Sequence, residues 1–127
     1  MKVLKNIMHV EDDRDIREIT RMSLELVGGF DVQQFSCGKD AIKCPPDMTP
    51  DMVLLDVMMP VMDGIETLKQ LRKLEHFAGV PIVFVTAKAT HADFGQLEAL
   101  GAKGIILKPF EPMELPGQLV KIWEACQ

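Results

Sequence analysis

Five short apolar runs alternate with longer amphipathic segments along the 127 residues of this chain. Short apolar runs bounded by turn residues are typical of buried strands, whereas apolar residues three and four positions apart are typical of helices packed on a core. The predicted strands are residues 6–10, 30–35, 52–55, 80–85 and 104–107. Alternation of strand and helix predicts an α/β fold, a doubly wound parallel sheet of five strands with five helices on its two faces.

Residues that start or stop helices stand at the ends of several predicted helices. The first, residues 14–27, is expected to stop at Gly28 and to bury one stripe of residues: Ile16, Ile19, Ser23, Leu26 and Val27. Thr90 and Asp93 resemble a capping box at the start of the fourth helix. Pro116 lies where a proline disturbs helical hydrogen bonding, so the last helix is expected to begin with a distorted turn, or only at about Gly117.

Length and composition limit the class of protein. A chain of 127 residues, 47% of them hydrophobic and 26% charged, predicts one globular domain over residues 1–127. No apolar run reaches the roughly 18 residues of a membrane-spanning helix. The net charge of -5 argues against direct binding of nucleic acid, which depends on neutralising phosphates. Cys37, Cys44 and Cys126 lack metal-type spacing and are interpreted as free thiols, which predicts a cytoplasmic protein.

Polar side chains follow four of the five predicted strands. Glu11 and Asp12 follow the first strand, and Asp56, Thr86 and Lys108 follow the third, fourth and fifth. Because the carboxyl ends of parallel strands meet at one edge, where ligands bind in open sheets, these groups are expected to lie together. Three adjacent carboxylates favour a hard divalent cation such as Mg²⁺. A lysine and a hydroxyl suit phosphate oxygens, so the set predicts phosphoryl transfer onto an aspartate.

These residues stand in the order and spacing of a known family. The chain resembles, over essentially its whole length, the receiver domains of bacterial two-component response regulators. Four segments carry the resemblance: Val10-Glu11-Asp12-Asp13, the stretch from Asp56 to Gly64, Val85-Thr86-Ala87, and Lys108-Pro109-Phe110. The resemblance implies a flavodoxin-like strand order of 2-1-3-4-5. It also implies a cis peptide bond between Lys108 and Pro109.

The resemblance assigns a role to each residue of the site. Asp56 is expected to be the phosphoacceptor, with Thr86 as a switch hydroxyl and Lys108 as the partner of the phosphoryl group. Asp12 is expected to ligate Mg²⁺ directly and Glu11 through a water. Asp56 and the backbone carbonyl of Met58 are expected to complete the protein ligands.

The resemblance also implies partners. A sensor histidine kinase or a histidine phosphotransfer protein is expected to donate the phosphoryl group. A downstream protein of unknown identity is expected to bind the surface of the fourth helix, fifth strand and fifth helix. The chain itself is expected to contact neither a membrane nor, directly, nucleic acid. The protein would be a switch, not an enzyme, and would catalyse only its own phosphorylation and dephosphorylation. Ile105 stands where the family often has an aromatic reporter residue, so the route of the signal is an open question.

Several alternatives stay open. The chain could be a receiver cut from a longer response regulator or hybrid kinase. A Mg²⁺-dependent phosphatase would need a second aspartate two residues after its nucleophile, and Met58 occupies that position. An interaction module that needs no phosphorylation is the third alternative. Among the polar residues, Asp13 and Asp63 are interpreted as helix caps and His9 as a buried, neutral core residue.

Overall fold

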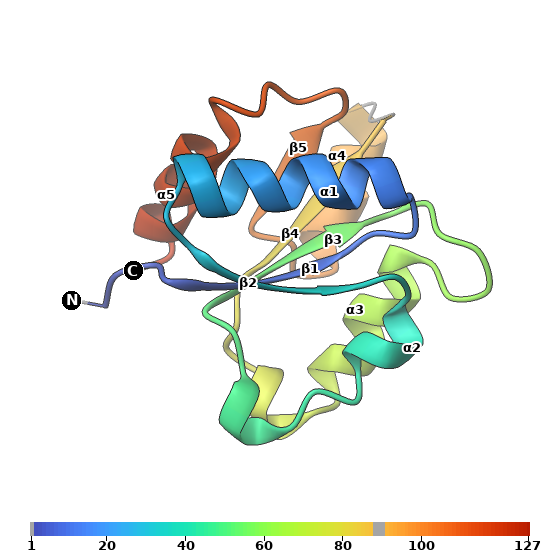
Figure 1. Ribbon diagram of the computed structural model, residues 1–127. Helices are drawn as coiled ribbons and strands as arrows, with labels where there is room; N and C mark the ends of the chain where they lie inside the picture. The colour runs from blue at the N-terminus through green and yellow to red at the C-terminus, as the bar shows by residue number, and fades with distance from the viewer. Residues whose placement is uncertain (1, 88–90) are drawn as a thin grey trace.

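The computed structural model describes residues 2–87 and 91–127, which form a sheet covered by helices on both faces (Figure 1). The strands are β1 (Asn6–Val10), β2 (Asp31–Phe35), β3 (Met52–Asp56), β4 (Ile82–Thr86) and β5 (Gly104–Leu107). The α-helices are α1 (Arg14–Met22), α2 (Gly38–Ala41), α3 (Gly64–Arg72), α4 (His91–Ala99) and α5 (Leu115–Ala125). A π-helix, η1 (Ser23–Val27), extends α1, and two short 3-10 helices are η2 (Pro46–Met48) and η3 (Glu75–Phe77).

The five strands lie in the order β2-β1-β3-β4-β5, and every neighbouring pair is parallel. The predicted fold class and strand order are therefore confirmed. The order reverses direction between β1 and β3, whose carboxyl ends carry the acidic residues of interest. A crevice at such a reversal is the usual ligand position in an open α/β sheet.

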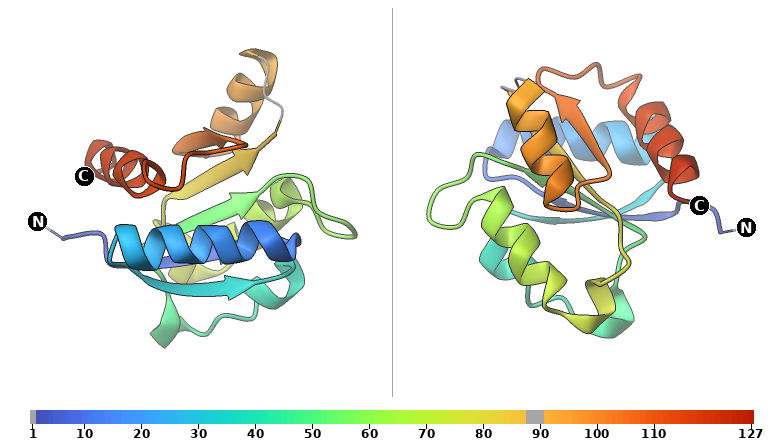
Figure 2. Two further views of the ribbon diagram at one scale, coloured as in Figure 1. Left: turned by 45° about the horizontal axis from the view of Figure 1, so that its top comes forward. Right: turned by 180° about the vertical axis from the view of Figure 1, so that it is seen from behind.

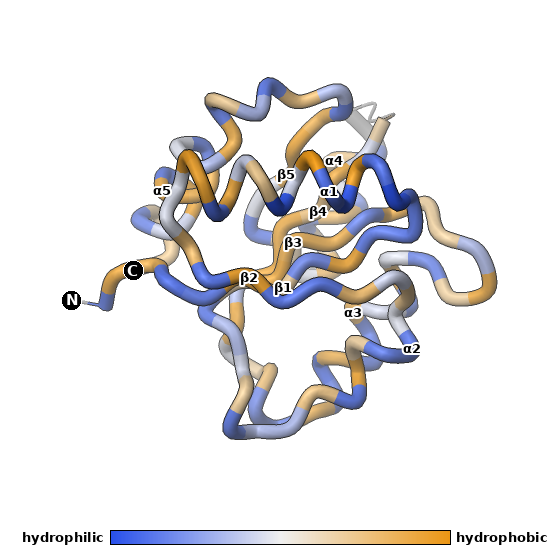
Figure 3. Tube along the Cα trace, in the orientation of Figure 1, coloured by the Kyte–Doolittle hydropathy of each residue, from blue (hydrophilic) through white to orange (hydrophobic). Residues whose placement is uncertain are grey.

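Successive residues of a strand point to opposite faces, so each strand supplies two separate cores. On β1, Ile7 packs in a cluster with Leu24, Leu115, Leu119 and Trp123, on the face covered by α1 and α5. Its neighbour Met8 packs with Leu68, Leu71, Phe77 and Leu97 on the opposite face, covered by α3 and α4 (Figure 2). The central strands β3 and β4 are buried throughout and form the hydrophobic centre of the chain trace (Figure 3).

The first helix differs from the prediction in its last turn. The backbone N–H of Gly28 donates to the carbonyl of Ser23, five residues back, at 3.1 Å, as in a π-helix. This wider turn rotates the following residues relative to a regular helix. Ser23 is buried as predicted, but Leu24 packs in the core in place of Leu26, which is 77% exposed. The predicted burial of Leu26 and Val27 is therefore wrong. Ile19, which lies in α1 before this turn, is 48% exposed while its neighbour Thr20 is buried, so the predicted burial of Ile19 is wrong as well.

The last helix begins at Leu115, two residues before the predicted alternative start at Gly117. Pro116 lies in its first turn, where a missing N–H leaves no hydrogen bond unmade. Thr90, the first residue of the predicted capping box, lies outside the described residues. All three cysteines are free thiols. Among the helices of the described ranges, none is long and apolar enough to cross a membrane.

Candidate functional site

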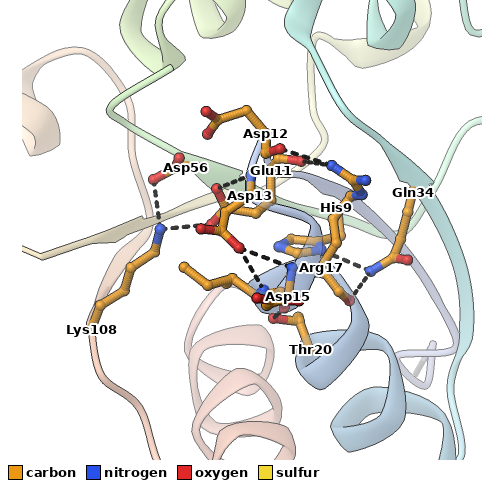
Figure 4. Close-up of polar contacts among 11 residues, drawn as sticks. His9, Glu11, Asp12, Asp13, Asp15, Arg17, Thr20, Gln34, Asp56 and Lys108 are labelled. Carbon is orange, nitrogen blue, oxygen red and sulfur yellow. Dashed lines mark hydrogen bonds and ion pairs between the residues drawn. The ribbon is translucent and has the colours of Figure 1, made fainter. Parts of the chain in front are cut away.

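The carboxyl edge of the sheet brings the predicted acidic residues together. Glu11 and Asp12 directly follow β1, and Asp56 is the last residue of β3. One carboxylate oxygen of each lies within 4.8 Å of the others. Glu11 and Asp56 are buried, whereas Asp12 is exposed, so the cluster opens to solvent on the side of Asp12 (Figure 4).

Lys108 follows β5 and extends over the edge of the sheet toward this cluster. Its ammonium Nζ donates to Oε1 of Glu11 at 2.6 Å and to Oδ1 of Asp56 at 3.1 Å (Figure 4). Both contacts are ion pairs, and the lysine side chain is itself mostly buried. Lys108 therefore bridges two of the three carboxylates and offsets part of their mutual repulsion.

The burial of these groups changes their pKa values. Burial is the main reason that the pKa of Glu11 rises from 4.5 to about 7, and the neighbouring Asp56 adds to it, while Lys108 opposes it. Burial alone would lower the pKa of Lys108, but its contacts with Glu11 and Asp56 outweigh that effect and raise it. Lys108 is therefore a permanent cation at neutral pH, whereas Glu11, with a pKa of about 7, gains or loses its proton in this range.

The loop after β1 is fixed from α1. The Asp13 carboxylate accepts hydrogen bonds from the backbone N–H groups of Asp15 and Ile16, so Asp13 is the predicted helix cap. The guanidinium of Arg17 donates to the backbone carbonyls of Glu11 and Asp12. The composition of the loop did not reveal Arg17. Arg17 lies on the second turn of the helix, from which side chains point back toward the N-terminus, and this position could have predicted its contact with the loop.

The loop after β3 approaches the same edge from the other side. Asp63 caps α3 by accepting from the N–H of Glu66, as predicted. A Cβ atom on Gly64 would lie 2.1 Å from the carbonyl oxygen of Asp56, so glycine is required at this close approach. The sequence reasoning assigned Gly64 to the motif but missed this contact. Met58 has a 76% exposed side chain, and the role of its backbone carbonyl stays a prediction.

Thr86 and Pro109 complete this edge of the sheet. Thr86 is buried at the end of β4, and its carbonyl accepts from the backbone N–H of Lys108 at 2.8 Å. The peptide bond between Lys108 and Pro109 is cis, as expected. A mostly apolar hollow of about 370 Å³ lies beside Thr86 and is lined by residues that include Met58, Ile65 and Leu97. Ile105 packs against the core cluster on the α3 and α4 face.

The donor atoms at this edge fit a hard divalent cation. Carboxylate oxygens from three residues converge, those of Glu11 and Asp56 buried, and Asp12 leaves an open side for water ligands. The described residues hold no other group of this kind with three acidic, histidine or cysteine ligands. His9, although close in sequence, is 1% exposed within β1, and burial lowers its pKa to about 3, so it is the neutral core residue predicted.

Comparisons with known proteins agree with this geometry. The family model of the response regulator receiver domain matches residues 7–119. The alkaline phosphatase synthesis transcriptional regulatory protein PhoP of Bacillus subtilis is 37% identical over 118 residues, which are 93% of this chain and 48% of that protein. The DNA-binding response regulator MtrA of Mycobacterium tuberculosis is 38% identical over 112 residues, 87% of this chain and 47% of that protein. The chain thus spans about half the length of these curated relatives.

Solved structures have the same architecture. The chemotaxis protein CheY4 of Vibrio cholerae superposes with a TM-score of 0.87 at 28% identity, covering 94% of this chain and 99% of that one. The receiver domain of sensor histidine kinase PA1611 from Pseudomonas aeruginosa has a TM-score of 0.82 at 26% identity, covering 97% and 99%, and holds a magnesium ion in its active site cleft. With the strand order, the acidic cluster and the family match in agreement, this chain belongs to the response regulator receiver domain family, whose members are signalling switches of two-component systems.

Proposed function

We propose that the chain is a phosphorylatable receiver that accepts a phosphoryl group on Asp56 and changes its affinity for a protein partner. The observation that carries the proposal is the contact of Lys108 with both Asp56 and Glu11 beside Asp12 at one sheet edge. A buried ammonium and a carboxylate nucleophile over an acidic cluster are the groups that phosphoryl transfer requires. A phosphatase with the same nucleophile is disfavoured because Met58 occupies the position of its general acid.

In the proposed reaction, a carboxylate oxygen of Asp56 attacks the phosphorus of a phosphohistidine on a sensor histidine kinase or a phosphotransfer protein. A P–O bond to Asp56 forms as the P–N bond breaks, and the imidazole leaves with the electron pair. The ammonium of Lys108 then exchanges its contact with the Asp56 oxygen for a phosphoryl oxygen. Because Lys108 stays charged at neutral pH, it keeps this role over the physiological range.

Receiver domains bind Mg²⁺ in this site, and we propose Asp12, Asp56 and the carbonyl of Met58 as its direct protein ligands, with Glu11 acting through a water. When bound, Mg²⁺ neutralises negative charge that develops on the transferring phosphoryl oxygens. Glu11 must be deprotonated to contribute, and Asp12 supplies the solvent-facing carboxylate.

We further propose that Thr86 moves onto the phosphoryl group and that the surface of α4, β5 and α5 transmits the change. The hollow beside Thr86 supports the proposal, because it gives the Thr86 side chain room for such a shift. Ile105 is aliphatic, so the signal would pass through displacement of backbone and helix, not through rotation of an aromatic ring. Thr86→Ala should still accept the phosphoryl group but lose the change in partner affinity.

The proposal treats residues 1–127 as one domain, including the part of α5 that follows residue 119, where the family match ends. Trp123 on α5 is buried in the same core as β1, and its indole N–H donates to the carbonyl of Lys2 at 3.2 Å. PhoP is named a transcriptional regulatory protein and MtrA a DNA-binding response regulator, and both are about twice as long as this chain, so a receiver within a longer regulator or hybrid kinase is the alternative form of the same function. Direct DNA contact by this acidic domain and a membrane location form no part of the proposal, and a cytoplasmic location stays a prediction.

Phosphorylation by a small donor tests the proposal. Acetyl phosphate with Mg²⁺ should add one phosphoryl group to the protein, measured by intact-mass spectrometry, and Asp56→Asn should abolish it. Asp63→Asn is the matched control, because asparagine also caps a helix and the residue lies on the same loop. Equal phosphorylation of Asp56→Asn, or none of the wild type with any donor, would rule the proposal out. Phosphoramidate, which carries a P–N bond, tests the preference for a phosphohistidine-like donor.

A further inference from the structure

Arg17 joins the helix α1 to the backbone of the two acidic residues after β1. Its Nη1 donates to the carbonyl of Glu11 at 2.9 Å and to the carbonyl of Asp12 at 3.0 Å (Figure 4). One planar, permanently charged group thus holds two consecutive peptide units. The carboxylates of those units are two of the three that converge at the sheet edge.

Arg17 is itself anchored to the sheet. Its backbone carbonyl accepts from the side-chain amide of Gln34 on β2 at 2.7 Å. The same amide nitrogen lies 3.0 Å from Nδ1 of the buried His9 on β1. Because an amide nitrogen only donates, Nδ1 of His9 accepts, and both hydrogens of the Gln34 amide are used. The Gln34 side chain thus connects β2 to His9 on β1 and to the backbone of α1 at Arg17.

We infer that Arg17, held by Gln34 and His9, is a positioning residue that fixes the backbone of Glu11 and Asp12 in the arrangement that binds the divalent cation. The inference rests on the proposed function, since it concerns the same metal site. Neither Arg17 nor Gln34 touches the carboxylates through a contact of its own in the described structure, so their effect passes through the peptide units.

The physical reason lies in the demands of Mg²⁺ and the repulsion within the cluster. Mg²⁺ requires nearly octahedral geometry with short bonds, so small displacements of a ligand weaken binding. The segment of Glu11 and Asp12 lies outside the regular ladder of β1, and its carboxylates repel Asp56. Hydrogen bonds to a charged donor are stronger than neutral ones, so Arg17 resists the outward movement that this repulsion favours.

The test measures Mg²⁺ binding to the full chain by isothermal titration calorimetry, without any phosphodonor. Arg17→Ala should raise the Mg²⁺ dissociation constant about tenfold, the size expected for groups that orient metal ligands. At saturating Mg²⁺ the rate of acetyl phosphate labelling should return to within about twofold of the wild type, because the reacting groups are intact. Trp123 lies at the other end of the sheet, beside Lys2, so its fluorescence would not report the site.

Two matched variants separate hydrogen bonding from charge. Arg14→Ala removes the same charge from an exposed position on the same helix and should leave the Mg²⁺ dissociation constant within about twofold of the wild type. Gln34→Met should weaken binding less than Arg17→Ala, and the two changes should be less than additive because they act in one network. In the metal-free protein, Arg17→Ala should also speed hydrogen exchange at the amides of Glu11 and Asp13.

The outcomes distinguish the inference from the function on which it rests. If the wild type binds no Mg²⁺ and is not labelled at Asp56, the proposed function fails. If the wild type does both and Arg17→Ala binds Mg²⁺ equally well, or if Arg14→Ala weakens binding as much, the positioning role is wrong. Should Arg17→Ala fail to fold, Gln34→Met carries the test alone, and an unchanged dissociation constant in that variant contradicts the inference.

Discussion

The ammonium of Lys108 lies 2.6 Å from Oε1 of Glu11, although β5 and β1, the strands that precede these residues, are separated in the sheet by β3 and β4. The lysine reaches Glu11 by passing Asp56, to which it also donates. This contact links the two outer parts of the site across its centre. It also places a cation against a carboxyl group whose protonation is shifted into the neutral range.

The raised pKa of Glu11 makes the stability of the metal-free protein depend on pH. Between about 4.5 and 7 the folded protein binds a proton at Glu11 that the unfolded chain does not, so the free energy of unfolding falls as pH rises through this range. Glu11→Gln should flatten this part of the curve. Urea denaturation in the presence of a chelator, from pH 4.5 to 8, measures the difference between the two proteins. Parallel curves for wild type and variant would contradict the shift.

Mg²⁺ binding should depend on the same group with the opposite sign. A metal ligand must be deprotonated, so affinity increases as Glu11 ionises. With a pKa of about 7, the dissociation constant should fall about tenfold between pH 6 and pH 8. Titration calorimetry at several pH values, in buffers of different ionisation enthalpy, should also detect proton release. Glu11→Gln should bind more weakly with little dependence on pH, and an unchanged pH profile in that variant would assign the proton elsewhere.

The fold and most of the site could be predicted from the sequence because both depend on local patterns. The period of apolar residues identified the strands, and parallel order then brought their carboxyl ends together. The packing of the first helix could not be predicted, because a π turn changes the angular position of the residues beyond Ser23 without a signal in the apolar spacing. This is why Leu26 was wrongly assigned to the core. Ile19 was wrongly assigned for another reason, since the residue buried beside it is the polar Thr20, which an apolar pattern does not select.

The contacts that support the site were missed for a different reason. The close approach of Gly64 to the carbonyl of Asp56, and the bonds from Arg17 to the loop after β1, are three-dimensional consequences of how β3, α3 and α1 meet. A sequence motif shows which residues recur with the chemistry, but it does not show the distance between a backbone oxygen and a missing Cβ atom.

Gly64→Ala tests that close approach. A Cβ atom would lie 2.1 Å from the carbonyl oxygen of Asp56 and 2.8 Å from Cα of Val57, so backbone must move. The free energy of unfolding should fall by about 1–3 kcal/mol, and Mg²⁺ binding should weaken because Asp56 shifts. Gly117→Ala is the matched control, since this helical glycine on α5 has open space around its Cβ position. There the change should stabilise the protein by up to about 1 kcal/mol.

At Val61 the opposite change, from a larger residue to glycine, should stabilise the protein. The N–H of Met62 donates to the carbonyl of Pro60 at 2.8 Å and closes a three-residue turn around Val61, whose φ is 68°. A γ-turn with positive φ is rare and strained, most of all for a β-branched residue. The Val61 side chain is fully exposed, so its removal loses no packing.

Val61→Gly should therefore raise the free energy of unfolding by about 1 kcal/mol, because relief of a strain of about 1–3 kcal/mol exceeds the added entropy of the unfolded chain. Val3→Gly is the same substitution at another exposed valine, whose φ is negative. It should lower the free energy of unfolding slightly, by the entropy term alone. Urea denaturation of both variants measures the two signs. If both substitutions destabilise the protein equally, the turn around Val61 stores no strain, and the loop after Asp56 adopts its conformation without an energetic cost there.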